Sequence, residues 1–188
     1  MSETCVKILA ISGSLRTGSS NTALLSAAAT LFPENTTFKT YEGLADLPHF
    51  SPELDGDDSP VPVKNLRALL QEADGVLICT PEYAYGMPGV LKNALDWTVS
   101  TGEFAGKPVV AISASPYSTG GAQAHASLVL TLSALAANTV EPGSLIVPFV
   151  RTKLGANGDI SDPATAQSLR ALLGLLVKVV KRLMGGDL

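Results

Sequence analysis

The sequence has 188 residues, of which 46% are hydrophobic and 16% charged, with a net charge of −4 at pH 7 and a pI of about 5.1. A chain of this length and hydrophobic content can bury a substantial core, which argues against a disordered protein. The acidic balance, with no cluster of Lys and Arg before the C-terminal segment, argues against a general nucleic-acid binder.

Short apolar runs of strand length alternate with segments of helical periodicity along the chain. We predict strands at residues 6–12, 36–42, 75–80, 109–114 and 145–150. We predict helices near residues 21–32, 61–73, 88–100, 121–138 and 164–184. The runs 76–79 and 109–112 lack apolar–polar alternation, which is typical of strands covered on both faces. Five strands alternating with five helices predict an α/β fold, a three-layer sandwich around a five-stranded parallel sheet.

No repeat, linker or low-complexity tract divides the chain, so we expect one domain over residues 1–188. The longest irregular stretch, residues 43–60, is acidic and contains prolines, and we interpret it as a surface loop. Its carboxylates Asp55, Asp57 and Asp58 resemble a metal site, but solvation within the loop is the favoured interpretation.

The last segment is predicted to be an amphipathic helix that Asp162 caps and Pro163 begins. Its apolar run, residues 171–177, is far shorter than the roughly 20 residues that span a bilayer. Lys178, Lys181 and Arg182 then interrupt the run. A helix lying on a membrane surface stays open, whereas packing against the core is favoured. Residues 1–7 show no basic region followed by an apolar stretch, so we expect no secretory signal.

The two cysteines, Cys5 and Cys79, are predicted to lie at opposite ends of neighbouring parallel strands. About six residues at ~3.3 Å each would separate them, which is too far for a disulfide. Two cysteines alone also do not make a zinc or iron–sulfur site. A reduced, cytoplasmic setting is therefore expected.

Three unusual loops follow the first, third and fourth predicted strands, namely 13–21, 81–89 and 115–121. In an open parallel sheet, ligands bind outside the carboxyl ends of the strands, near the point where the strand order reverses. These loops are therefore expected to meet at one edge of the sheet and to form the binding site.

The first loop, GSLRTGSSN, combines backbone N–H groups at a helix N-terminus with hydroxyls and the guanidinium of Arg16. These groups suit a phosphate monoester. The loop lacks the Gly-Lys-Ser/Thr of a nucleoside-triphosphate site and the GxGxxG of a dinucleotide site. The alternative, a capped serine-rich turn with Arg16 facing solvent, stays open.

The second loop, PEYAYGMPG, is stiffened by Pro81 and Pro88 and can present Tyr83 or Tyr85 to a flat heterocycle. The alternative is that these tyrosines only pack. The third loop adds small and polar residues at the same sheet edge, among them Ser115, Tyr117, Thr119 and the pair Gly120–Gly121.

Nothing in the sequence indicates a hydrolase, because no G-x-S-x-G motif occurs and neither His49 nor His125 has an evident partner. His125 is interpreted as a capping, packing or interface residue. Where no side chain has the pattern of a nucleophile or base, we expect a cofactor to carry the chemistry.

The loop GSLRTGSSN together with PEYAYGMPGVLKNALDW at 81–97 resembles the NADPH-dependent FMN reductase family, and the resemblance runs from the first strand to the final helix. It implies a flavodoxin-like fold with sheet order 2-1-3-4-5, FMN as cofactor, and NADPH or NADH as reductant. It further implies two-electron ping-pong hydride transfer to quinones or related acceptors (chromate, azo or nitro compounds), with no catalytic side chain. A homodimer or tetramer with the flavin near the interface is also implied, with no nucleic-acid or membrane partner.

The resemblance also implies roles for individual residues. The expected FMN-phosphate loop contains Ser14, Leu15, Arg16, Ser19, Ser20, Asn21 and Thr22. The expected isoalloxazine and ribityl contacts, largely through backbone amides, come from Pro81, Glu82, Tyr83, Ala84, Tyr85 and Gly86. Ser115 and Tyr117 would close the other edge of the site. Structural roles are expected for Lys92, Asn93, Asp96 and Trp97, and interface roles for Tyr85 and His125.

One position departs from the family pattern, because Ala84 stands where the family commonly has asparagine. A side-chain hydrogen bond is lost there, while backbone contacts can remain.

Two alternatives to an enzyme stay open. A flavodoxin-type electron carrier would bind FMN without oxidising NAD(P)H, although its usual strongly acidic surface does not match a charge of −4. A flavin-free interaction module is the other.

Overall fold

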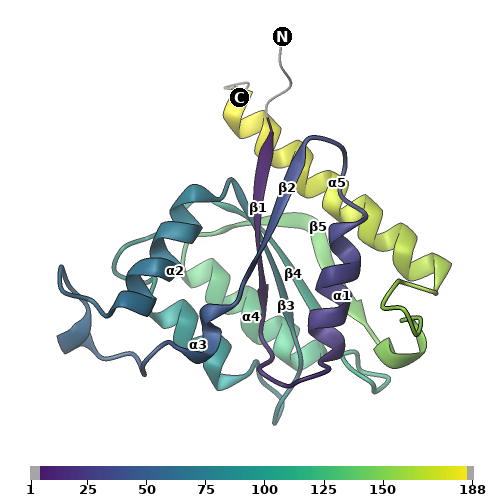
Figure 1. Ribbon diagram of the computed structural model, residues 1–188, viewed down its shortest axis with the longest axis horizontal. Helices are drawn as coiled ribbons and strands as arrows, with labels where there is room; N and C mark the ends of the chain where they lie inside the picture. Colours follow the sequence, from purple (N-terminus) through teal and green to yellow (C-terminus); the bar gives the residue numbers. More distant parts are fainter. Residues whose placement is uncertain (1–4, 186–188) are drawn as a thin grey trace.

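The computed structural model describes residues 5–185. Five parallel strands form a sheet in the order β2-β1-β3-β4-β5, which confirms the predicted topology (Figure 1). The strands are β1 (Val6–Ser12), β2 (Thr36–Tyr41), β3 (Gly75–Thr80), β4 (Pro108–Ala114) and β5 (Asn138–Val147). Strands β3 and β4 are buried along their whole length, as their continuous apolar runs predict.

Helices cover both faces of the sheet and give it three layers (Figure 1). The helices are α1 (Ser20–Ala29), α2 (Val61–Glu72), α3 (Gly89–Asp96), α4 (Ala122–Ala134) and α5 (Pro163–Gly185). One core layer is closed by α1 and α5 and the other by α2, α3 and α4. Three short 3₁₀ helices, η1 (Gly43–Ala45), η2 (Pro52–Leu54) and η3 (Val150–Thr152), lie in the connections.

The fifth strand differs from its prediction. It was expected at 145–150, but β5 begins at Asn138 and ends at Val147, and the helix expected to reach residue 138 ends at Ala134. Pairing with β4 extends the strand at its start, where Pro108 lies opposite Asn138. At the other end Phe149, with φ 51°, turns the chain out of the sheet. The segment 148–152 is therefore a turn followed by η3 and not part of the strand.

The C-terminal helix α5 packs on the sheet. It begins at a cap in which the Asp162 carboxylate accepts hydrogen bonds from the Thr165 backbone N–H (2.9 Å) and hydroxyl (2.6 Å). These hydrogen bonds lower the pKa of Asp162. By length and composition α5 could cross a membrane, but its apolar stripe is buried against the strands. The stripe contains Leu169, Leu172, Leu173, Leu176, Val177 and Val180.

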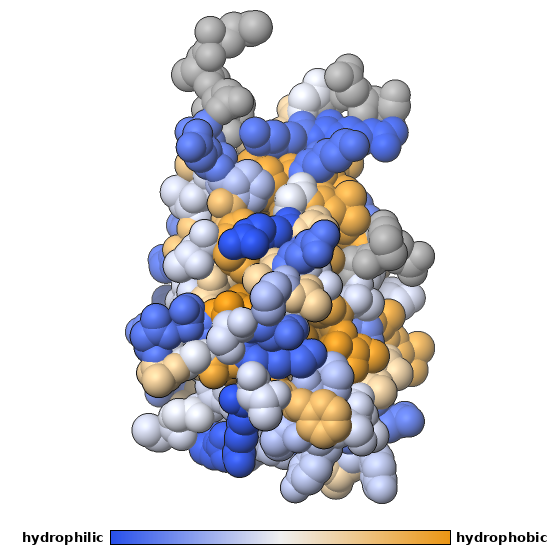
Figure 2. Space-filling view, turned by 90° about the vertical axis from the view of Figure 1, so that its right-hand side faces the viewer, coloured by the Kyte–Doolittle hydropathy of each residue, from blue (hydrophilic) through white to orange (hydrophobic). Residues whose placement is uncertain are grey.

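Figure 2 shows a group of hydrophilic side chains at the top of the molecule and others scattered over the rest of this face. Lys178, Lys181 and Arg182 are exposed where α5 ends. The beginning of β1 lies at this same end, and the loops that follow the strands lie at the opposite end (Figure 1).

The acidic loop 43–60 is attached to the core by a buried arginine. Arg67 of α2 is 8% exposed and donates to the Trp97 carbonyl, to Ser59 Oγ (3.0 Å) and to the Asp55 carboxylate (2.6 Å). Asp55 is therefore an ion-pair partner and not a solvated loop residue, and its pKa is lowered, chiefly by the hydrogen bond from Arg67. Asp57 and Asp58 are exposed, as expected of a solvated loop.

Candidate functional site

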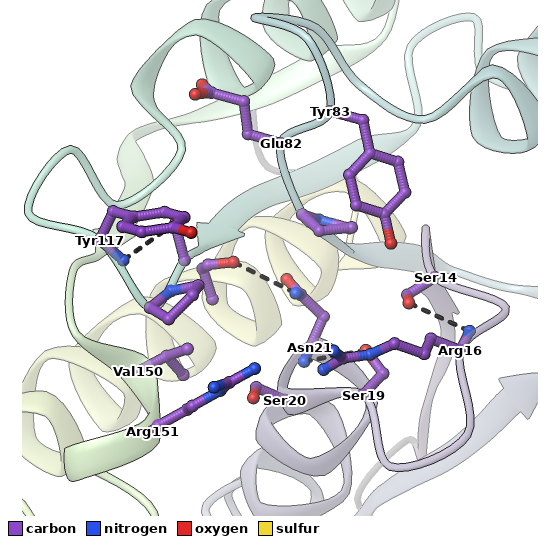
Figure 3. A pocket seen from close by; sticks show the side chains of 14 residues that line it. Ser14, Arg16, Ser19, Ser20, Asn21, Glu82, Tyr83, Tyr117, Val150 and Arg151 are labelled. Atoms are coloured by element: carbon purple, nitrogen blue, oxygen red, sulfur yellow. Dashed lines mark hydrogen bonds between the residues drawn. The ribbon is translucent and has the colours of Figure 1, made fainter.

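The loops that follow β1, β3, β4 and β5 meet at the carboxyl edge of the sheet and enclose a pocket of about 300 Å³ (Figure 3). This volume is in the range of small-molecule sites. The lining residues are Ser14, Arg16, Ser19, Ser20, Asn21, Pro81, Glu82, Tyr83, Ala114, Ser115, Pro116, Tyr117, Val150 and Arg151. The three loops chosen from the sequence therefore share one pocket, and a fourth loop completes it.

The first loop is a closed turn that leads into α1. The Ser19 side chain caps the helix by accepting from the Asn21 N–H (3.2 Å), and the Arg16 carbonyl accepts from the Ser19 N–H (3.1 Å). Ser14 Oγ accepts from the Arg16 N–H (3.3 Å). The loop is thus a capped turn with an exposed Arg16, as one interpretation predicted, and Arg16 also lines the pocket at the positive end of the helix dipole.

Asn21 and Thr22 brace this loop through their side chains. The Asn21 amide donates to the Ala114 carbonyl (3.2 Å) and accepts from the Cys79 thiol (3.1 Å), so it connects α1 to β3 and β4. Burial raises the pKa of Cys79, which keeps the thiol protonated as a donor. The Thr22 hydroxyl lies 2.8 Å from Ser12 Oγ and does not line the pocket. Leu15 is also outside the lining.

The second loop contains a tight two-residue turn. Tyr83 and Gly86 exchange two backbone hydrogen bonds of 3.0 Å, and both central residues have positive φ, 50° at Ala84 and 62° at Tyr85. This is the pattern of a type I′ turn. The turn carries Tyr85 away from the protein, where it is 83% exposed, and Ala84, Tyr85 and Gly86 do not line the pocket. Of this loop, Pro81, Glu82 and Tyr83 face the pocket.

Glu82 connects the second loop to α4. Its carboxylate accepts from the backbone N–H groups of Gln123 (2.9 Å) and Ala124 (3.1 Å), in the first turn of the helix. The N-cap position is Gly121, which has no side chain to supply these acceptors. Glu82 therefore satisfies the helix N-terminus from a distant loop and positions α4 beside the pocket.

The loops after β4 and β5 are hydrogen-bonded to each other. The Ser115 N–H donates to the Val147 carbonyl (3.1 Å), and the Val150 N–H donates to the Ser115 carbonyl (3.0 Å). The Phe149 N–H donates to the Tyr117 carbonyl (3.3 Å). Tyr117 itself is 73% exposed at the mouth of the pocket. This pairing brings the segment 148–152 into the site.

Four lining residues were not predicted from the sequence, namely Ala114, Pro116, Val150 and Arg151. Val150 was missed because the fifth strand was expected to continue to residue 150, and Arg151 was missed because the loop after that strand was not among the three loops chosen. Pro148 was the signal that could have found them, because a proline has no N–H to continue a strand ladder. With the strand ended before Pro148, the rule that sites form at carboxyl-end loops would have pointed to this segment.

His125 lies on α4 and packs within the protein. Its side chain is buried, with Nε2 3.3 Å from the Ala111 carbonyl of β4, and burial lowers its pKa. It does not line the pocket. A residue that is 7% exposed has little surface for a partner, so of its three interpretations the structure favours packing over the interface role.

The pocket has two chemically different sides. One side has the N-terminus of α1 with the guanidinium groups of Arg16 and Arg151, which suit an anion (Figure 3). The other side has the rings of Pro81, Tyr83 and Tyr117, which suit a flat apolar group. A ligand with a phosphate at one end and an aromatic system at the other matches both sides.

Comparison with known proteins finds relatives that are named as FMN or quinone reductases. The chain is 33% identical over 182 residues to the NAD(P)H-dependent FMN reductase of Pseudomonas aeruginosa, covering 96% of this chain and 98% of that protein. It is 33% identical over 171 residues to a 2-hydroxy-1,4-benzoquinone reductase of Burkholderia sp., covering 89% and 92%. It is 29% identical over 181 residues to the quinone reductase of Escherichia coli K12, covering 94% and 96%.

Solved structures agree with the sequence relatives. The flavoenzyme NAD(P)H:(acceptor) oxidoreductase FerB from Paracoccus denitrificans superposes with a TM-score of 0.85 at 28% identity, covering 94% of this chain and 98% of that one. A flavodoxin from the domain Archaea, with a TM-score of 0.62 at 13% identity over 94% and 99% of the two chains, shares the fold. The model of the family "NADPH-dependent FMN reductase" matches residues 6–152. The chain therefore belongs to the NADPH-dependent FMN reductase family.

Proposed function

We propose that the protein is an FMN-dependent NAD(P)H oxidoreductase that reduces quinone-like acceptors. The observation that carries the proposal is the two-sided pocket, with an arginine-flanked helix N-terminus facing a set of apolar rings. The names of the Burkholderia and Escherichia coli relatives support quinones as the acceptor class. The chemistry that bound FMN supplies is two-electron hydride transfer.

The residues of the pocket fit FMN at both ends of the molecule. The phosphate would be held by the α1 N–H groups, Ser14, Ser19, Ser20 and Arg16, all of which line the polar side. Asn21 would position the loop from the pocket wall, because its side-chain amide bonds to Ala114 and Cys79 and its backbone N–H donates to Ser19 Oγ. Leu15 and Thr22 would support the loop from behind, since neither lines the pocket.

The flat end would rest on the loops after β3 and β4. This side is lined by Pro81, Tyr83, Ser115 and Tyr117. Glu82 holds the loop after β3 against α4 through its hydrogen bonds to the helix N–H groups. Ala84, Tyr85 and Gly86 form the turn at the rim and would reach the cofactor only from its outer edge. The side chains that line the pocket would position the cofactor and shield it from water. None of them is assigned a role as a general acid or base.

The test is a titration of the purified protein with FMN, followed by steady-state oxidation of NADPH or NADH with a benzoquinone acceptor. We expect saturable quenching of flavin fluorescence and acceptor-dependent oxidation of at least one nicotinamide. FMN binding without any nicotinamide oxidation would identify an electron carrier and contradict the proposal. Failure to bind FMN would identify an interaction module and also contradict it.

We further propose a homo-oligomer, a dimer or tetramer, in the cytoplasm. The exposed aromatic residues at the pocket mouth, Tyr83, Tyr85 and Tyr117, support an interface beside the site. The free cysteines, exposed Cys5 and buried Cys79, support a reducing compartment. Light scattering coupled to size-exclusion chromatography, and fractionation of the producing cells, test the two parts separately.

A further inference from the structure

Arg151 stands on a firmly anchored backbone. It is the central residue of η3, directly after Val150, whose side chain is fully buried and whose N–H donates to the Ser115 carbonyl (3.0 Å). On the other side, the Thr152 hydroxyl and N–H both donate to the Phe149 carbonyl (2.9 Å each). The chain on both sides of Arg151 is therefore fixed, and its side chain projects into the pocket (Figure 3).

The guanidinium groups of Arg151 and Arg16 point toward each other over Ser20 at the start of α1 (Figure 3). Among the side chains that the structure describes, Arg67 pairs with Asp55 and Lys92 with Asp96, and neither pocket arginine has a carboxylate partner. Two cations and the positive end of a helix dipole thus converge without a counter-charge. Such an arrangement is unfavourable until an anion binds between the cations.

The charge and geometry of the two arginines specify the kind of anion. A phosphate monoester carries a charge of about −1.5 to −2 at pH 7 and offers three acceptor oxygens. A single guanidinium neutralises only part of that charge, whereas two on opposite sides can each bind a pair of oxygens. The α1 N–H groups remain available for the third oxygen.

We propose that Arg151 is a phosphate-binding residue which, with Arg16 from the opposite side, clamps the 5′-phosphate of FMN and selects FMN over unphosphorylated riboflavin. The proposal rests on the proposed function, because it assumes that FMN is the ligand. It assigns the selectivity to a residue from the loop after β5, outside the loop that follows β1. Arg151 is a binding residue and takes no part in the hydride transfer.

The test measures the dissociation constants of FMN and riboflavin by fluorescence quenching for the wild type, Arg151→Gln, Arg16→Gln and Arg170→Gln. Arg170 on α5 is an exposed arginine outside the pocket lining, so Arg170→Gln controls for the change in net charge. We expect Arg151→Gln to weaken FMN binding about 10- to 100-fold and riboflavin binding less than about 3-fold, since a hydrogen bond to a charged group is lost. Arg170→Gln should leave both constants at wild-type values.

A second measurement separates binding from a structural role. Because Arg151 has no partner among the described residues and faces another cation, Arg151→Gln should unfold, without flavin, at the wild-type temperature or above it. Raising the salt concentration should weaken FMN binding more in the wild type than in Arg151→Gln. Equal loss of FMN and riboflavin binding, or a lowered unfolding temperature of the apoprotein, would overturn the proposal.

Three other outcomes would each overturn the clamp, for different reasons. If Arg151→Gln binds FMN like the wild type but has a raised KM for NADPH and not for NADH, Arg151 serves the reductant and the clamp is wrong. If the wild type itself binds no FMN, the proposed function fails, and the clamp fails with it. If the wild type binds FMN and Arg151→Gln binds it equally well, only the clamp fails.

Discussion

Ala84 and Tyr85 occupy the central positions of a turn in which both residues need positive φ. For a residue with a Cβ atom, the left-handed conformation costs roughly 1–2 kcal/mol, and asparagine tolerates it better than alanine does. The family's usual asparagine at position 84 therefore has a backbone role that the sequence alone did not indicate, in addition to any side-chain hydrogen bond. Alanine at this position stores a small strain at the rim of the pocket.

This strain predicts that Ala84→Asn raises the free energy of unfolding by about 0.5–1 kcal/mol, part of the left-handed cost. Ala84→Val is the matched comparison, because a β-branched side chain is worse than alanine at positive φ and should lower stability. Urea denaturation of the apoproteins measures both changes. Equal stability of the two variants would show that the turn does not hold position 84 in the left-handed region.

Among single residues, those whose location follows from chain order were predictable, whereas those defined by a partner were not. Ser14 and Arg16 follow a strand directly and precede a helix, so the fold places them at the sheet edge whatever their contacts. Arg67 lies on a regular helix, and nothing in its own segment indicates that Asp55 and the Trp97 carbonyl hold it. The same is true of Glu82, whose partners lie about forty residues away.

At the scale of elements, the junction between the loop after β4 and the end of β5 defines one wall of the pocket. Gly120 has φ 62°, and a Cβ atom there would lie 2.4 Å from Ile146 Cγ2 and 3.0 Å from the Pro148 nitrogen. A contact at the first distance requires the Ile146 side chain to move, and the backbone at Pro148 would also have to give way slightly. Glycine at position 120 is thus needed for both its conformation and its lack of a side chain.

Gly120→Ala is accordingly predicted to lower the free energy of unfolding by about 2 kcal/mol or more, from left-handed strain plus overpacking. Gly102→Ala separates the two causes, because Gly102 has a similar φ of 70° with nothing within 4 Å of the added atom. It should cost only the conformational part, about 1 kcal/mol. Thermal and urea unfolding of both variants measure the difference, and similar losses would contradict the steric explanation.

The elements themselves were predictable where their pattern was long and regular. All five strands and five helices exist, and the order of the sheet is as expected. The errors lie at ends, where tertiary contacts decide. Pairing with β4 extends β5 back to Asn138, and the turn at Phe149 ends it three residues early. Hydrophobic periodicity predicts neither the pairing with β4 nor the turn at Phe149.

At the scale of the whole molecule, stability depends on pH through groups whose pKa differs between the folded and unfolded states. Burial lowers the pKa of His125 from 6.5, so below about pH 6.5 the unfolded chain binds a proton that the folded protein does not. Stability therefore falls on acidification through this region, by at most about 1.4 kcal/mol per pH unit for one proton. Asp55 and Asp162, with lowered pKa values, add a second loss only below about pH 3.8.

We therefore expect His125→Gln to flatten the dependence of the unfolding free energy on pH between about 7 and 5, while the loss below pH 3.8 persists. The slope is the measured quantity, because the substitution also changes packing and so shifts the absolute stability. Denaturant unfolding at a series of pH values gives the slope for each variant. An unchanged slope between pH 7 and 5 would place the responsible group elsewhere.

The beginning of β1 and the end of α5 lie at the end of the molecule opposite the loops that form the pocket (Figure 1). Parallel strands impose this polarity, because every strand delivers its following loop to the same edge. A tether attached at either terminus would therefore hold the protein on a solid support or electrode with the pocket facing solution. The fold orients the protein for immobilisation without any change to the residues that line the pocket.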